Sequence, residues 1–265
     1  METPVITGRR IKQYLSEGKR FDGRKLGEFR NIIIETDISN KAEGSTRVKI
    51  GKTEVIVGVK LDVSEPYPDS PDKGNLMTTA ELLPMSSDRI SAGKPGFDSI
   101  EIGRVIDRAI RESKFIDLEK LCIKKGEKVW TVFIDIYSIN DDGDMLDAAG
   151  IGAIVALKNA KMPKYNEETG KVIFGEWTED KMPLSNKTPL SITIHKVGND
   201  FIVDPTREEE DLSEARITIG SYDGVISSIQ KGEKESLSIA EVSEVLDLAE
   251  KTTNEVFKKI DKYIK

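Results

Sequence analysis

The chain has 265 residues, with 40 Lys and Arg against 47 Asp and Glu, a net charge of −7, one Cys and one His. A hydrophobic fraction of 37%, no apolar run near the roughly 18 residues that span a bilayer, and a single cysteine (Cys122) together predict a soluble cytoplasmic protein. The single histidine, His195, argues against a Cys/His zinc cluster or a His-based triad, and the acidic charge excludes a broadly basic nucleic-acid binder but not a local basic patch.

In chain order, the first part of the sequence predicts a short helix, a series of strands and two longer helices. The strand before Gly51-Lys52 and the strand after it form a hairpin signal. A proline-rich acidic stretch over 64–75 and a glycine-punctuated stretch over 86–96 predict exposed loops. The expected helices span about 10–17, 99–114 and 145–161, and the expected strands span 29–38, 46–50, 54–63, 77–83 and 128–139.

After a Pro- and Lys-rich connector over 161–189, the pattern starts again. The capping box Ser238-x-x-Glu241 opens a long helix that is expected to run to residue 264. Each half therefore contains several strands followed by at least one long helix, which predicts an α+β fold with a loose internal repeat. The expected strands of this half are 191–196, 200–203, 215–221 and 225–230.

Three arginines on the predicted helix 99–114 are the first candidate for a binding site. At 100° per residue, Arg104, Arg108 and Arg111 form one stripe opposite the apolar face. Guanidinium groups on a rigid helix suit phosphate oxygens. The same helix also has the spacing for intrahelical ion pairs, so a salt-bridged solvent face is the alternative, and the residues alone favour it. The pairs expected on that alternative are Glu101–Arg104, Asp107–Arg111 and Arg108–Glu112.

Other polar clusters have simpler interpretations. The acidic segment 140–144 resembles a metal loop, but Gly152 stands where a calcium loop needs a carboxylate, which favours a turn and helix start. Gly44-Ser45-Thr46-Arg47 precedes a strand and therefore leads into a hairpin, and His195 is expected as a packed strand residue. Asp204 and the run 208–211 are expected to form a solvated acidic loop. The residues alone show no catalytic constellation.

The order of motifs resembles the RNase PH family from about residue 10 to 260. It consists of Arg20-Phe21-Asp22-Gly23-Arg24 with Arg30 after it, Gly44-Ser45 before a hairpin, EIGRVIDRAIRES, KVWTVFIDIYSINDDGDMLDAA and PLSITI…VDPTREEE. Within that family the chain is most similar to the non-catalytic RNase PH-like subunit of the archaeal exosome. The resemblance implies a ribosomal protein S5 domain 2-like fold with two related βαβ-containing lobes. The implied domains are an N-terminal helix and arm (1–28), a first RNase PH-like domain (29–162), a connector (163–186) and a second RNase PH-like domain (187–265).

Departures from the family's active pattern imply that this chain is not itself a catalyst. Active members hold phosphate in a Gly-Gly-Thr/Ser-Arg loop, and here Asp144 stands in place of a glycine and Leu146 in place of the arginine. A negative charge and an apolar side chain do not bind phosphate. Active members also place a general-acid aspartate in a GEAD-like segment, where this chain has Arg216, which cannot relay a proton.

The resemblance further implies partners and a role in RNA degradation. The chain is expected to alternate with a catalytic RNase PH-like subunit in a hexameric ring, a trimer of heterodimers that degrades RNA from the 3′ end with phosphate. S1/KH-type RNA-binding cap proteins and single-stranded RNA are the other expected partners. On this basis Arg104 and Arg108, and more weakly Arg111, are expected to contact the RNA backbone; no cofactor, metal or membrane is expected.

Two alternatives stay open. One is an active phosphorolytic 3′-to-5′ exoribonuclease or nucleotidyltransferase of the RNase PH type, which would need the phosphate loop that is replaced here. The other is a small-molecule kinase of the same S5-like topology, suggested by the Gly- and Ala-rich segment 148–153. That segment lacks the Ser-containing glycine loop that cradles ATP phosphates.

Overall fold

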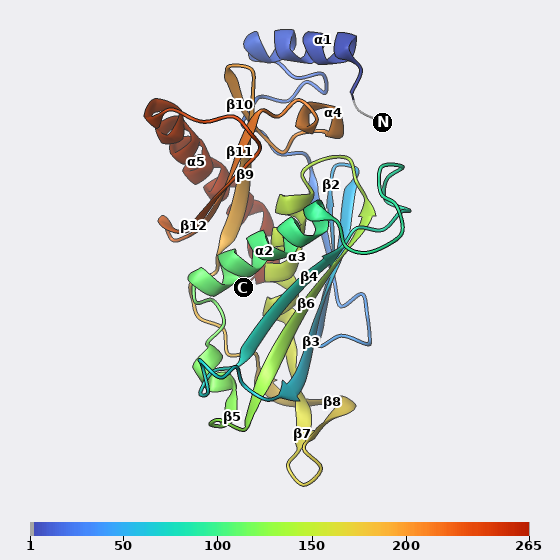
Figure 1. Cartoon of the computed structure of the whole chain (residues 1–265), viewed down its shortest axis with the longest axis vertical. Helices are drawn as coiled ribbons and strands as arrows, with labels where there is room; N and C mark the ends of the chain where they lie inside the picture. The colour runs from blue at the N-terminus through green and yellow to red at the C-terminus, as the bar shows by residue number, and fades with distance from the viewer. Residues whose placement is uncertain (1–2, 265) are drawn as a thin grey trace.

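The computed structural model describes residues 3–264 and shows an α+β protein of two lobes, each with its own sheet (Figure 1). The first lobe contains a six-stranded sheet in the order β1-β2-β3-β6-β4, with β5 paired to β6. Its strands are β1 (Ile32–Thr36), β2 (Gly44–Ile50), β3 (Thr53–Ser64), β4 (Asn75–Glu81), β5 (Cys122–Lys124) and β6 (Lys128–Asn140). Its helices are α2 (Phe97–Glu112), the 3-10 turn η1 (Leu118–Leu121) and α3 (Met145–Asn159).

The second lobe is smaller and repeats the same theme. Its sheet has the strand order β10-β9-β11-β12, and the long helix α5 packs on β9 and β11. The elements are β9 (Leu190–Val197), β10 (Asp200–Val203), α4 (Arg207–Glu210), β11 (Ala215–Tyr222), β12 (Val225–Gly232) and α5 (Ile239–Ile264). The expected capping box forms at the start of α5, where Glu241 N donates to Ser238 Oγ and Ser238 N donates to Glu241 Oε2. Within residues 3–264, no helix is long and apolar enough to cross a membrane.

Helix α3 lies between the two lobes and joins their cores. It packs on β2 and β3 on one side and on β9 and α5 on the other, and every residue from Met145 to Leu157 is buried. Small residues allow this close fit, because a Cβ at Gly152 would lie 2.7 Å from a methyl group of Val57. The small-residue helix expected from the sequence is therefore confirmed, and it is the central layer of the fold.

Helix α2 is held against the edge strand β4. The Ser99 hydroxyl donates to the carbonyl of Ala80, and a Cβ at Gly103 would lie 3.0 Å from the carbonyl oxygen of Thr78. A glycine and a serine on one face thus bring the helix close to the strand. The face that carries Arg104 and Arg108 consequently points away from the core.

Two segments differ from the predicted secondary structure because contacts with distant parts of the chain determine their conformation. The N-terminal helix α1 spans Val5–Ser16 rather than 10–17, and it includes Gly8, which packs directly against Leu212. The segment expected only as a connector forms a hairpin, β7 (Lys161–Asn166) and β8 (Lys171–Lys181). The Tyr165 ring meets Trp130 of β6 edge-to-face, with 6.0 Å between ring centroids.

The prediction that Asp204 and 208–211 form a solvated loop is wrong. Asp204 and Glu209 are buried, and they bind three arginines from the segment before β1: Arg20, Arg24 and Arg30. We call these five residues the arginine–carboxylate network. Local charge density indicated solvation, but the partners lie more than 170 positions away in the chain.

Each arginine of the network has a distinct set of acceptors. Arg20 is fully buried, pairs with both carboxylate oxygens of Glu209, and donates to the carbonyl oxygens of Val203 (2.9 Å) and Asp204 (2.8 Å). Arg24 Nη1 donates to Asp204 Oδ2 at 2.7 Å. Arg30 Nη2 donates to Asp204 Oδ1 at 2.6 Å, and its Nη1 donates to the carbonyl oxygen of Asp142 at 2.9 Å in the first lobe. Arg30 therefore ties the two lobes together.

Replacing the central carboxylate tests this network. Asp204→Ala leaves Arg24 and Arg30 without their shared partner in a poorly solvated site, so we expect the free energy of unfolding to fall by about 3–5 kcal/mol. Denaturant unfolding monitored by circular dichroism measures the change. Asp69→Ala, at an exposed loop position, is the matched control and should change stability by less than about 0.5 kcal/mol. Equal stability of the two variants would contradict the structural role of Asp204.

Candidate nucleic-acid interface

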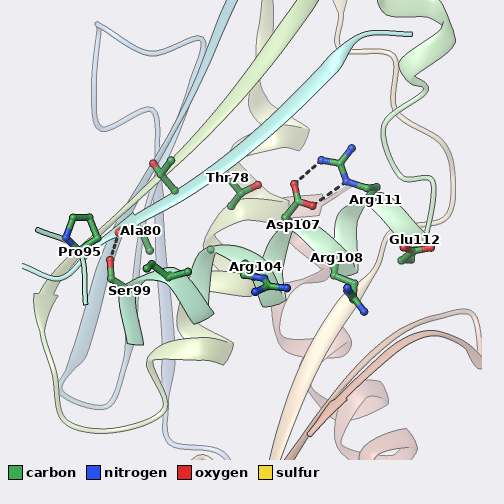
Figure 2. A pocket seen from close by; sticks show the side chains of 12 residues that line it. Thr78, Ala80, Pro95, Ser99, Arg104, Asp107, Arg108, Arg111 and Glu112 are labelled. Carbon is green, nitrogen blue, oxygen red and sulfur yellow. Dashed lines mark hydrogen bonds and ion pairs between the residues drawn. The ribbon is translucent and has the colours of Figure 1, made fainter. Parts of the chain in front are cut away.

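The arginine stripe borders a groove between α2 and the edge strand β4. This α2–β4 groove has a volume of about 470 Å³, and its walls include Thr78 and Thr79 of β4 and the side chains of Arg104, Arg108 and Arg111 (Figure 2). The geometry predicted from the helical wheel is thus present, because all three arginines line one surface. Their individual environments, however, differ.

Arg111 is committed to an ion pair, whereas the other two arginines are not. Arg111 donates to both carboxylate oxygens of Asp107, at 2.9 and 2.8 Å, and to the carbonyl oxygen of Leu76 at 3.0 Å. The Asp107 carboxylate raises the pKa of Arg111. Arg104 and Arg108 are exposed and make no hydrogen bond or ion pair with any residue between 3 and 264. Figure 2 shows Arg111 and Asp107 turned toward each other and no such link at Arg104 or Arg108.

The intrahelical ion pairs of the alternative interpretation are therefore formed at one position of three. Glu101, the expected partner of Arg104, pairs instead with Arg216 of β11. Among the described residues, Glu112 forms no ion pair with Arg108. Two unpaired guanidinium groups one helical turn apart remain at the groove, and they can donate to successive anionic groups of a polymer.

Asp144, Leu146 and Arg216, the three positions that depart from the active pattern of the RNase PH family, lie at the boundary between the two lobes. Leu146 and Arg216 line a pocket of about 320 Å³, which we call the interlobe pocket. Leu146 is buried and has no polar side-chain group, and Arg216 forms an ion pair with Glu101 through its Nη2. Asp144 immediately precedes α3 with a positive φ of 58°. The turn and helix start expected for 140–144 is confirmed.

The other arginines of the interlobe pocket are also neutralised within the chain. Arg89 donates to both carboxylate oxygens of Asp211, at 2.5 and 2.8 Å. Arg207 pairs with Asp141 at 3.2 Å and with Glu210 at 3.1 Å. Burial raises the pKa of Glu210 to about 6, against the opposing effect of Arg207. The pocket therefore contains balanced ion pairs rather than a cationic phosphate site.

In the segment 142–146, which stands where active members have the phosphate loop, the backbone of Gly143 is already hydrogen-bonded within the chain. Gly143 has a φ of 87°, and its amide donates to Asp141 Oδ1 at 3.2 Å. The carbonyl of Gly143 accepts from Thr53 Oγ1 at 2.6 Å and from Arg30 Nη2 at 3.1 Å. Among the described residues, no group of three His, Cys, Asp or Glu side chains is placed to hold a metal ion. The amide and carbonyl groups of Gly143 are thus hydrogen-bonded to the chain's own side chains.

His195 is a packed strand residue, as expected. Its Nδ1 lies 3.1 Å from Ser213 Oγ, and its side chain is buried where β9 meets β11. Burial lowers the pKa of His195 to about 3, and the charge of nearby Arg216 acts in the same direction. The ring is therefore neutral near pH 7, and the adjacent arginine disfavours the imidazolium that a general base would become.

Sequence reasoning missed two residues of the seam, Asp147 and Arg89. Asp147 is fully buried in the first turn of α3, and its Oδ2 accepts from the backbone amide of Thr193 on β9 at 3.0 Å. Its Oδ1 and both carboxylate oxygens of Asp144 have no hydrogen-bond partner among the described residues. An aspartate within the apolar run MLDAA was the available signal for Asp147. No local pattern could have indicated Arg89.

Comparison with known proteins agrees with this architecture. Residues 28–163 match domain 1 of the 3′ exoribonuclease family, and residues 187–252 match domain 2 of the same family. It is 42% identical to the exosome complex component Rrp42 of Methanothermobacter thermautotrophicus, covering 98% of this chain and 96% of that protein. It is 47% identical to the exosome complex component Rrp42 of Thermococcus onnurineus, covering 94% of this chain and 92% of that protein. A chain of the Archaeoglobus fulgidus exosome with RNA bound to the active site superposes with a TM-score of 0.88 at 39% identity, covering 96% of this chain and 98% of that one.

Replacing Asp147 should change how stability depends on pH. Burial raises the pKa of Asp147 to about 8, so the folded state holds a proton that the unfolded chain releases near pH 4. Asp147 therefore contributes to the free energy of unfolding a term that declines as the pH rises between those values. Asp147→Asn keeps an acceptor for Thr193 but cannot ionise, so its stability relative to the native chain should rise across this range by a few kcal/mol, on the order set by linkage.

Thermal or denaturant unfolding of both proteins between pH 4 and 8 measures this difference. The matched control is Asp69→Asn, at an exposed position, which should give a constant offset from the native chain. Parallel stability curves for Asp147→Asn and the native chain would contradict an ionisation penalty at Asp147.

Proposed function

The chain is a member of the 3′ exoribonuclease (RNase PH) family, and on this premise we propose that it is a non-catalytic, RNA-contacting subunit of an archaeal-type exosome. In this proposal it alternates with a catalytic RNase PH-like subunit in a six-membered ring that degrades RNA from the 3′ end with phosphate. The relatives named exosome complex component Rrp42 support the assignment to such a complex. The ion pairs that neutralise the arginines of the interlobe pocket support the non-catalytic role.

The pairing of Arg216 with Glu101 is the observation that carries the non-catalytic assignment. Phosphorolysis requires a cationic or amide-lined site for inorganic phosphate and an acid to protonate the leaving group. In the interlobe pocket, Arg89, Arg207 and Arg216 are all neutralised by carboxylates of the same chain. A phosphate ion entering the pocket would have to displace one of those carboxylates or be repelled by it.

The α2–β4 groove supports an RNA-contacting role. Arg104 and Arg108 are unpaired within the described residues, and helix α2 holds them in fixed relative positions. Contacts from guanidinium groups to backbone phosphates are independent of base sequence, which suits a complex that degrades many RNAs. Arg111, which Asp107 neutralises, contributes less than the other two.

The open face of the large sheet supports the presence of a subunit partner. Helices α2 and α3 cover the opposite face, and within residues 3–264 no helix packs on this one (Figure 1). Ile33, Met77 and Tyr137 are exposed there among charged side chains. Exposed apolar side chains on a sheet face that no helix covers suit a contact with the catalytic subunit. Cap proteins with S1 or KH domains and a cytoplasmic location complete the proposal.

Purified chain alone should have no phosphorolytic activity. Incubated with RNA and inorganic phosphate, it is expected to release no nucleoside diphosphate above a phosphate-free control, because the interlobe pocket cannot accept phosphate. The same chain co-assembled with its catalytic partner should support phosphate-dependent release. Phosphate-dependent release by this chain alone would identify it as an active exoribonuclease of the RNase PH type and overturn the non-catalytic assignment.

Removing the two unpaired arginines should weaken RNA binding by the assembled ring. Arg104→Ala with Arg108→Ala is expected to lower affinity about tenfold at low salt and to reduce the slope of log K against log salt by about 1.4, or 0.7 per lost phosphate contact. Fluorescence anisotropy with a single-stranded oligonucleotide over a salt series measures both quantities. The control, Lys258→Ala with Lys259→Ala at exposed positions on α5, removes two positive charges elsewhere. It should leave the affinity and the salt slope unchanged. An unaltered slope in the arginine variant would exclude backbone contact at this stripe.

A further inference from the structure

Two large apolar side chains at the start of α2 are left outside the core. Phe97 is 76% exposed and Ile100 is 54% exposed, although the opposite face of the same helix is buried. At 100° per residue, both fall in the sector that carries Arg104 and Arg108. With a rise of 1.5 Å per residue, Phe97 lies about 10 Å along the helix axis from Arg104. The apolar residues and the unpaired arginines therefore form one continuous strip.

Phe97, Ile100 and Arg104 also share a hollow with the second lobe. This α2–β12 hollow has a volume of about 260 Å³ and lies between α2 and the strands β11 and β12. A cavity of about 150 Å³ already accommodates a benzene ring, so the hollow has room for a planar heterocycle. Of its cationic side chains, Arg216 is paired with Glu101 and Lys231 donates to backbone carbonyl groups, so Arg104 remains unpaired.

We propose that Phe97 and Ile100 form a stacking platform for one base of single-stranded RNA, next to the phosphate contacts of Arg104 and Arg108. The inference rests on the proposed function and extends it from backbone contact to base contact. An aromatic ring stacks on any of the four bases, so the platform requires no particular sequence. The neighbouring guanidinium groups favour a polyanion over an uncharged peptide as the occupant of this strip.

Substitutions at Phe97 in the ring assembled with its catalytic partner test the platform. Phe97→Ala should lower affinity for a single-stranded oligonucleotide by about fivefold or more, the range found for loss of base–aromatic stacking. Phe97→Trp should retain the native affinity, and its added fluorescence should be quenched when RNA binds. Because stacking involves no counterion release, Phe97→Ala should leave the salt slope unchanged, unlike the arginine variant. Phe174→Ala, at a 62% exposed aromatic position on β8, is the matched control and should bind RNA normally.

Abasic substitution in the RNA gives a second, independent readout. Removing one base at each position in turn should reveal a position that weakens binding to the native ring but not to the Phe97→Ala ring. Native affinity of Phe97→Ala for intact RNA would overturn the platform, and so would impaired ring assembly with RNA affinity unchanged, which would assign Phe97 to a protein contact. If Phe97→Ala has no effect while the arginine variant still weakens binding, the platform fails and the proposed function stands. A native ring that does not bind RNA would instead refute the proposed function.

Discussion

The burial of Asp204 and Glu209 against three arginines is the interaction on which the other features depend. Arg30 contacts Asp204 in the second lobe and the backbone of Asp142 and Gly143 in the first, so one guanidinium bridges the two lobes. Buried charges of this kind tolerate no loss of a partner, because an isolated charge in a dry site is far less stable than a paired one. The network and helix α3, which packs on β2, β3, β9 and α5, together join the two lobes.

The distribution of charge explains how an acidic chain can present a nucleic-acid surface. Most arginines near the seam are neutralised by carboxylates, including Arg20, Arg89 and Arg207, and they act as internal ties. Local potential depends on which charges are left unpaired and not on their sum over the chain. Arg104 and Arg108 are two such unpaired charges within the described residues, and they stand next to each other on one rigid helix. A net charge of −7 is therefore compatible with a phosphate-binding groove.

Features that arise within one helix or strand could be predicted from the sequence. Features that depend on partners far away in the chain could not. The alternation in β6, the small residues of α3 and the capping box of α5 all act within one element, and the structure contains each of them. The prediction of a solvated loop over 208–211 is wrong because local charge density cannot show that Glu209 binds Arg20, which lies 189 positions earlier. The arginine stripe shows the same limit. Helical spacing permits three intrahelical ion pairs, but it cannot show that only the pair of Asp107 with Arg111 forms among the described residues.

The choice between those ion pairs links the interlobe pocket to the α2–β4 groove. Glu101 has two arginines within reach, Arg104 three positions along its own helix and Arg216 on β11, and it binds Arg216. That pair is partly buried, so it is less screened by water than an intrahelical pair at the surface would be. By pairing with Arg216, Glu101 neutralises one of the three arginines that line the interlobe pocket. By the same contact, Glu101 leaves Arg104 without a partner at the groove. One ion pair thus affects two surfaces: it neutralises Arg216 in the interlobe pocket, and it leaves Arg104 unpaired at the groove.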